Sequence, residues 1–179
     1  MTTMEKVSAG ISAIANQVFD KEPLNYLEVA GLYAIVAAGR HNMVSLEVLY
    51  NHARDPELKA LIRRAIDEQT DWLINKAEHL LQASDGLLPT LHFARRKLHD
   101  SSPDLPDDAH FSDQEIVGAI ASMAKASQTA VLSAMHQTYQ PEVAQVYRRI
   151  LDAAFDFNYS LLQLALDKGW LPHMAKVKH

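Results

Sequence analysis

Apolar residues recur every three or four positions along most of the chain, the spacing that places side chains on one side of an α-helix. The segments between Gly and Pro positions are rich in Ala, Leu, Glu, Lys, Gln and Arg, which are strong helix formers. We therefore expect an all-α fold. The pattern predicts a short amphipathic helix over residues 4–19 and long helices over residues 25–53, 56–83, 113–139 and 141–168.

Each long helix carries an apolar stripe that we expect to face the core. In the helix over residues 25–53 the stripe consists of Val29, Leu32, Val36, Met43, Leu46 and Tyr50. In the helix over residues 56–83 it consists of Leu58, Leu61, Ile62, Ala65, Ile66, Leu73, Ala77 and Leu80. In the last helix it consists of Val143, Val146, Tyr147, Ile150, Ala154, Phe157, Leu161 and Leu164.

Short turns join the long helices in pairs. Asp55-Pro56 and Gln140-Pro141 each place Pro at the first helical position, and Asp55 is suited to be an N-cap. Turns this short require the two helices of each pair to run antiparallel, as a hairpin. Ser112 with Glu115 has the spacing of a capping box, and Gly169 is suited to end the last helix.

One motif occurs once in each predicted hairpin. The first copy consists of Pro56-Glu57-Leu58, Arg63-Arg64, Asp67, Asp71-Trp72 and Leu88-Pro89. The second copy consists of Pro141-Glu142-Val143, Arg148-Arg149, Asp152, Asp156-Phe157 and Leu171-Pro172. An internal repeat of this kind predicts that each copy buries one apolar face against the other.

Residues 84–112 form a connection that is unusually long for a compact domain. We expect a crossover along the bundle, with a helical turn or two over residues 91–98. Two hairpins joined in this way, residues 25–83 and 113–169, have the topology of a ferritin-like four-helix bundle. The sequence therefore predicts a single domain over residues 1–179.

Composition excludes several classes of chemistry. The chain of 179 residues has no cysteine, so disulfides, thiolate metal sites and cysteine nucleophiles are absent. A net charge of −5 and a pI near 6.0 give no reason to expect a nucleic-acid partner. The N-terminus lacks the pattern of a signal peptide, and no stretch reaches the roughly 20 apolar residues of a membrane span. We expect a cytoplasmic protein with no membrane insertion.

Ferritin-like bundles often hold two metal ions, which require a Glu-x-x-His sequence on each of two helices. No Glu in this chain has His three residues later. We therefore expect no di-metal site, no cofactor and no catalytic residue. A single metal ion held by His41, Glu68 and Asp71 is geometrically conceivable. The alternative is that His41 belongs to the polar flank of its helix.

The repeated motif contains two carboxylate pairs, Asp67 with Asp71 and Asp152 with Asp156. Pairs of this kind can serve acid and base catalysis, but we favour a solvated helix face. That face in the last helix comprises Arg149, Asp152, Asp156, Tyr159 and Gln163, and we expect Arg64 and Arg149 to form local ion pairs with the acids.

Two further sets of residues allow both a packing role and a ligand role. Trp72 and Phe157 hold equivalent positions in the motif, and packing between the hairpins explains them better than a ligand cage. Small residues on the first helix of each hairpin allow either close helix approach or an apolar ligand. These residues are Ala34, Ala37, Ala38, Ala119, Ala121 and Ala124.

The second hairpin resembles the coat F family of bacterial spore proteins. The resemblance rests on Asp113-Gln114-Glu115-Ile116, Gln140-Pro141-Glu142 and Asp167-Lys168-Gly169-Trp170-Leu171-Pro172. The whole chain is similar to a related, functionally uncharacterised family of ferritin-like proteins from spore-forming bacteria. Its landmarks are Asp55-Pro56-Glu57-Leu58-Lys59, Phe111-Ser112-Asp113 and Lys168-Gly169. The resemblance implies a self-associating bundle and supplies no catalytic residue.

From the residues and the resemblance together, we expect a non-enzymatic structural or interaction protein of the spore coat or of sporulation. We expect it to form a homodimer through a helical face and to contact other spore-coat proteins, in the mother cell or in the coat. The alternative is a metal- or small-ligand-binding ferritin-like protein with a redox or stress role.

Overall fold

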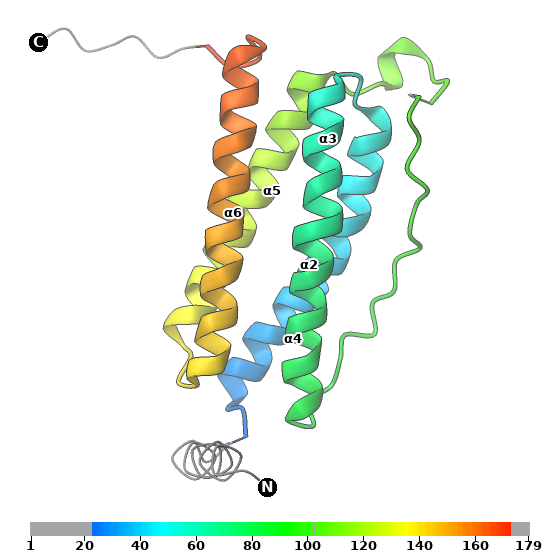
Figure 1. The fold of residues 1–179 in the computed structure, drawn as a ribbon. Helices are drawn as coiled ribbons and strands as arrows, with labels where there is room; N and C mark the ends of the chain where they lie inside the picture. Colours follow the sequence, from blue (N-terminus) through cyan, green and yellow to red (C-terminus); the bar gives the residue numbers. More distant parts are fainter. Residues whose placement is uncertain (1–22, 102, 173–179) are drawn as a thin grey trace, which may run out of the picture.

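The computed structural model describes residues 23–101 and 103–172, apart from the side chains of residues 68–71 and 107 (Figure 1). The helix predicted over residues 4–19 lies outside the described residues. Within them, all regular structure is helical. The elements are α2 (Tyr26–His52), α3 (Pro56–Arg64), the π-helix η1 (Ala65–Thr70), α4 (Asp71–Ala83), the 3₁₀-helix η2 (Asp107–Ala109), α5 (Asp113–His136) and α6 (Pro141–Asp167).

These elements form the predicted ferritin-like four-helix bundle. The path α3–η1–α4 packs against α2, and α6 packs against α5, so each hairpin is antiparallel. The hairpins meet through α2 with α5 and through α3 and α4 with α6. Helices α5 and α6 end earlier than predicted, at His136 and Asp167.

Hydrogen bonds define the starts of α2, α3 and α5, and they confirm the predicted Asp55 cap and Ser112 capping box. Asn25 and Ser112 form complete capping boxes with Glu28 and Glu115. The Asp55 side chain accepts hydrogen bonds from the first N–H groups of α3. Gly169 follows α6 with a φ of 70°, a left-handed conformation that glycine adopts without steric cost.

The π-helix η1 changes which residues of α4 enter the core. A continuous α-helix predicts Leu73 and Leu80 as core residues, but both are only partly buried. Ile74 and Leu81, each one position later, are buried instead. A π-turn takes up more residues than an α-turn, so the stripe beyond it shifts along the sequence.

The prediction of helical turns over residues 91–98 is wrong. The crossover runs in an extended conformation from the end of α4 toward the opposite end of the bundle (Figure 1). Extended chain on a helix surface cannot satisfy its own backbone groups, so side chains must do so.

Side chains of α2 and α3 hold the crossover along its length. Arg40 Nη1 donates to the carbonyl oxygens of residues 89 and 91, at 2.6 and 3.1 Å. The buried Glu47 carboxylate accepts from Arg95 Nε and from the N–H of residue 96. Asn51 donates to the carbonyl of residue 97 and accepts from the N–H of residue 99. Lys59 Nζ donates to the carbonyls of residues 99 and 100.

A glycine permits close approach within the first hairpin. A Cβ atom on Gly39 of α2 would lie 2.7 Å from Cγ1 of Ile74 on α4. Contacts that short do not occur between real side chains, so a larger residue here would push the helices apart. Gly39 therefore sets the spacing between α2 and α4.

At one end of the bundle, Glu28 joins the two hairpins. Its side chain is 2 % exposed. One carboxylate oxygen accepts the N–H of Asn25, which completes the capping box. The other accepts the N–H groups of Tyr139 and Gln140, at 2.8 and 2.7 Å, in the turn between α5 and α6. Gln140 supplies no side-chain cap to α6, and the turn depends on Glu28.

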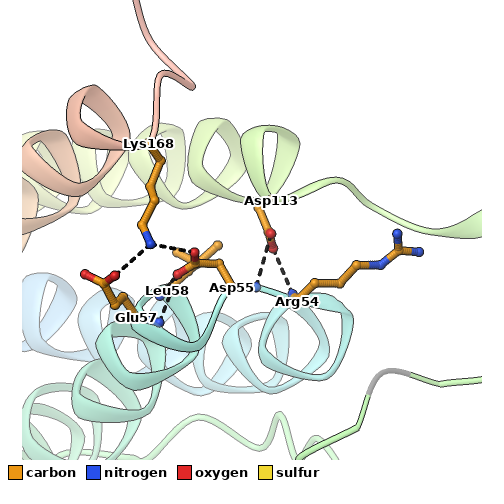
Figure 2. A network of polar contacts seen from close by, with 6 residues as sticks. All are labelled: Arg54, Asp55, Glu57, Leu58, Asp113 and Lys168. Atoms are coloured by element: carbon orange, nitrogen blue, oxygen red, sulfur yellow. Dashed lines mark hydrogen bonds and ion pairs between the residues drawn. The ribbon is translucent and has the colours of Figure 1, made fainter.

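At the opposite end, Asp113 makes the same kind of contact with the other turn (Figure 2). Its carboxylate accepts the N–H groups of Arg54 and Asp55, at 2.8 and 3.1 Å. Each turn is therefore held by a carboxylate at the start of the first helix of the other hairpin. Such charge-assisted hydrogen bonds are stronger than neutral ones.

Lys168 adds an ion pair at this end (Figure 2). Its Nζ lies 2.8 Å from Asp55 and 2.7 Å from Glu57, which joins the end of α6 to the start of α3. Burial opposes ionisation of Asp55, but hydrogen bonds from Lys168 and from the N–H groups of Leu58 and Glu57 lower its pKa. The bonds to Asp55 and Glu57 raise the pKa of Lys168.

We expect Glu28→Ala to destabilise the protein by about 3 kcal/mol, because it leaves two turn N–H groups without their acceptor. The matched control is Glu115→Ala, which removes the equivalent capping-box residue of α5 from an exposed site. Its expected cost is about 1 kcal/mol or less. Urea unfolding followed by far-UV circular dichroism measures both, and equal losses would contradict a special role for Glu28.

Candidate functional site

The described part of the bundle contains an apolar cavity of about 360 Å³ between the two hairpins. All four long helical segments contribute to its walls. From α2 come Gly31, Ala34, Ile35, Ala38, Gly39, Asn42 and Leu46, and from η1 and α4 come Ala65, Trp72 and Leu73. From α5 come Ile120, Met123, Ala124, Ser127, Gln128, Ala130, Val131 and Ala134, and from α6 come Ile150, Ala153, Ala154 and Phe157.

Small side chains explain why this space is not filled. Of the six small residues singled out in the sequence, Ala34, Ala38 and Ala124 line the cavity. The other three, Ala37, Ala119 and Ala121, do not border it. Ala34 and Ala38 line the cavity and are also exposed to solvent, so the cavity is open along α2.

Three polar side chains border the cavity. Asn42 Nδ2 donates to Ser127 Oγ at 3.0 Å, which links α2 to α5. Gln128 Nε2 is buried and has no hydrogen-bond partner within the described chain. An unpaired buried amide costs free energy.

Trp72 and Phe157 both line the cavity, which the packing interpretation did not anticipate. Their environments differ although their positions in the motif correspond. Phe157 is 5 % exposed, whereas Trp72 is 36 % exposed. Trp72 follows the π-helix η1, and α6 is α-helical throughout. The cavity wall is therefore not the same on the two hairpins.

Two histidines with unpartnered ring nitrogens lie near the C-terminal end of α2. The His52 ring lies 5.8 Å from the His110 ring and 5.3 Å from the Phe111 ring. Nδ1 of each histidine is buried without a hydrogen-bond partner in the described chain. Burial, and then the charge on His110, lower the pKa of His52. Sequence reasoning missed this pair because the crossover brings together residues that are distant in the chain.

Tyr147 is also buried, and its hydroxyl has no hydrogen-bond partner among the described residues. Its oxygen lies 2.9 Å from the position of a Cβ atom on Gly31, so the glycine makes room for it. Burial, and then the charge of Glu28, raise the pKa of Tyr147. The hydroxyl therefore stays protonated beside the wall of the cavity.

The proposed single-metal site receives no support from the described residues. His41 is exposed, and its ring lies 5.7 Å from that of Phe93 in the crossover. The side chains of Glu68 and Asp71 lie outside the described part. Where side chains are described, no group of three or more His, Asp or Glu residues could hold a metal ion.

The predicted solvated face of α6 is confirmed, since Arg149, Asp152, Asp156, Tyr159 and Gln163 are all exposed. Arg63 Nε, not Arg64, pairs with Asp67 at 3.2 Å, one helical turn away. Arg64 instead donates to Ser160 Oγ on α6.

The outer face of α5 and α6 is the other feature with functional potential. We use this name for a ridge of large exposed side chains on α6, formed by Phe155, Tyr159 and Leu162, and a shallow depression on α5. Asp156 and Gln163 of the solvated face flank the ridge. The depression is lined by Ala121, Ser122, Lys125, Ala126, Thr129, Ala130 and Ser133. Lys125 is the only charged residue between positions 116 and 135.

None of the described helices is long and apolar enough to cross a membrane.

Comparison with solved structures confirms the fold. A protein of Bacillus halodurans provisionally described as a spore coat protein is 25 % identical, with a TM-score of 0.81, over 89 % of this chain and 99 % of that one. A two-domain protein of Anabaena variabilis, which contains DJ-1/ThiJ/PfpI-like and ferritin-like domains, is 16 % identical with a TM-score of 0.63. That match covers 85 % of this chain and 40 % of the other.

Comparison with curated proteins and with family models gives the same relationship. The uncharacterised protein YvdQ of Bacillus subtilis is 27 % identical over 160 residues, which is 88 % of this chain and 92 % of YvdQ. Residues 12–178 match the model of a family described as proteins of unknown function, DUF3231. Because the match spans nearly the whole sequence, the protein belongs to this family.

Proposed function

We propose that this protein is a non-enzymatic structural or interaction protein of the bacterial spore coat or of sporulation, and that it associates with itself through the outer face of α5 and α6. The likeness to the Bacillus halodurans protein supports the biological setting. The exposed ridge of Phe155, Tyr159 and Leu162 on α6 is the observation that carries the proposal, because large apolar side chains grouped on a surface mark interaction sites.

The ridge has the geometry of a helix–helix contact. Phe155, Tyr159 and Leu162 are 57 %, 66 % and 45 % exposed. Their spacing of four and then three residues is that of the seam between two packed helices. A helix with this seam normally buries it against a second helix, and in the described monomer α6 leaves it exposed.

The depression provides the complementary surface. Its small side chains on α5 would accept the bulky side chains of a ridge, as ridges pack into grooves between helices. Ridge and depression belong to the same hairpin, so a twofold rotation can seat the ridge of each copy in the depression of the other. A second copy of the chain is therefore the partner that we propose.

We expect the purified full-length protein to be a dimer and Phe155→Glu to weaken dimerisation by about 30-fold, because it places a charge in the centre of the contact. The matched control is Leu87→Glu, at a loop residue that is 83 % exposed. Sedimentation equilibrium over a range of concentrations measures the dissociation constants. A monomeric wild type, or equal effects of the two variants, would show that this face does not mediate self-association.

In sporulating Bacillus subtilis cells, a fluorescent fusion of the protein should concentrate at the surface of the forespore. Phe155→Glu should spread through the mother cell if self-association helps to retain the protein there. Fluorescence microscopy through the course of sporulation provides the measurement, with the Leu87→Glu fusion as the control. Uniform fluorescence of the wild-type fusion at every stage would refute a coat role.

The non-enzymatic part of the proposal is tested by metal content. We expect purified protein from metal-supplemented cultures to contain iron, manganese and zinc only far below one equivalent per chain. Plasma mass spectrometry measures this after gel filtration. Stoichiometric metal that is lost in His41→Ala or Glu68→Gln would overturn the proposal in favour of a metal-binding protein with redox chemistry.

A further inference from the structure

We propose that residues 4–19, for which the sequence predicts an amphipathic helix outside the described residues, dock along α2 over the open side of the cavity between the hairpins. The occupant is a segment of the same chain, and it adds a further helix to the bundle, antiparallel to α2. The proposal is independent of self-association, because the ridge on α6 takes no part in it.

The open side of the cavity lies along one side of α2. Ala34 and Ala38 line this cavity of about 360 Å³ and are exposed, and Gly31 also lines it. Leu27, in the first turn of α2, is 52 % exposed and lies on the same side of the helix. These four positions are separated by four, three and four residues, which is the spacing of the seam between two packed helices. This side of α2 therefore has the form of an exposed helix seam.

The segment before α2 has a matching apolar stripe. Successive positions of this stripe are also separated by four, three and four residues, at Val7, Ile11, Ile14 and Val18. A chain that turns back just before α2 runs antiparallel to it, so the last residue of the stripe meets the first position of the seam. One register then aligns all four pairs, which are Val18 with Leu27, Ile14 with Gly31, Ile11 with Ala34 and Val7 with Ala38.

The length of the chain before α2 suits this pairing. Helix α2 begins at Tyr26 with Asn25 as its N-cap, so residues 20–24 remain for the turn. Helical hairpins use turns of about two to five residues. A helix over residues 4–19 is about 24 Å long, whereas the part of α2 from Tyr26 to Ala38 spans about 18 Å. The segment can therefore extend past the whole seam.

Side-chain size and covalent linkage both favour this occupant. Branched side chains of the segment would fit between the small residues of α2, as ridges pack into grooves between helices. Because the segment is joined to α2 by a short turn, its effective concentration at the seam is on the order of millimolar, which favours it over a separate molecule. Ala34 and Ala38 then serve the close approach of a helix, which is one of the two roles that the sequence leaves open for them.

Disulfide formation tests the register directly, since the natural chain has no cysteine. In the full-length protein with oxidised glutathione as the oxidant, we expect Ile11→Cys with Ala34→Cys to form a disulfide at least tenfold faster than Ala9→Cys with Ala34→Cys. Residues two positions apart do not share a helix side, and a disulfide requires Cα atoms within about 7 Å. Non-reducing gel electrophoresis measures the rate, and peptide mass spectrometry identifies the linkage.

Equal rates for the two cysteine pairs would overturn the proposal. A disulfide that joins two chains, in place of one within a chain, would also overturn it, because the occupant of the seam would then be a second copy. Dilution of the protein distinguishes these cases, since only the rate of formation between chains falls with concentration.

Hydrogen exchange followed by mass spectrometry tests docking in a chain without engineered cysteines. We expect amides of residues 4–19 to exchange at least tenfold faster in Ala38→Glu than in the wild type, because the variant places a charge in the seam. The control is Ala119→Glu, at an exposed position of α5 that does not border the cavity, and it should exchange like the wild type. Both substitutions are at exposed positions, and circular dichroism checks that the variants fold.

Equal exchange of residues 4–19 in the wild type and Ala38→Glu would show that the segment does not dock on this seam. The dimerisation variant Phe155→Glu should leave the exchange of residues 4–19 unchanged. Faster exchange in Phe155→Glu would place the segment in the contact between copies and would overturn the proposal, so failure of docking and failure of dimerisation can be told apart.

Discussion

The bundle depends on carboxylates that reach from one hairpin to the turn of the other. A turn between two helices leaves backbone N–H groups just before the second helix without partners, and these groups need acceptors. Glu28 supplies them at one end and Asp113 at the other. Since each carboxylate is fixed at the start of a helix, these bonds set how far one hairpin can slide along the other, and so they fix the alignment of the cavity walls.

The extended crossover also has backbone groups that lack partners within the crossover itself. Side chains of α2, namely Arg40, Glu47 and Asn51, form hydrogen bonds with these groups. The result is a bundle whose two hairpins differ in what covers them. The first hairpin carries the crossover on its surface, whereas no segment among residues 23–172 that the structure describes covers the outer face of α5 and α6 in this way.

Local rules predicted most of the fold, because helix periodicity and capping depend on neighbouring residues. Asn25 to Ala53, the Asp55 cap and the Ser112 capping box follow from the sequence in this way. The shift from Leu73 to Ile74 in the core could not be predicted, because nothing in the local sequence distinguishes the π-turn. The cavity, the His52–His110 pair and the extended crossover result from contacts between distant segments. The sequence also cannot distinguish an alanine that borders a cavity from one that packs against another helix, because both fit the same helical spacing.

The crossover that covers one hairpin has a consequence for assembly. A protein with a single self-complementary face can bind only one further copy of itself through that face. A twofold contact then buries the face in both copies. Association then stops at a closed pair and cannot extend into a sheet or filament by itself. In a layered shell, such a dimer would be a separate building unit. Contacts between dimers would have to come from other proteins that bind the surface of the first hairpin, which carries the crossover.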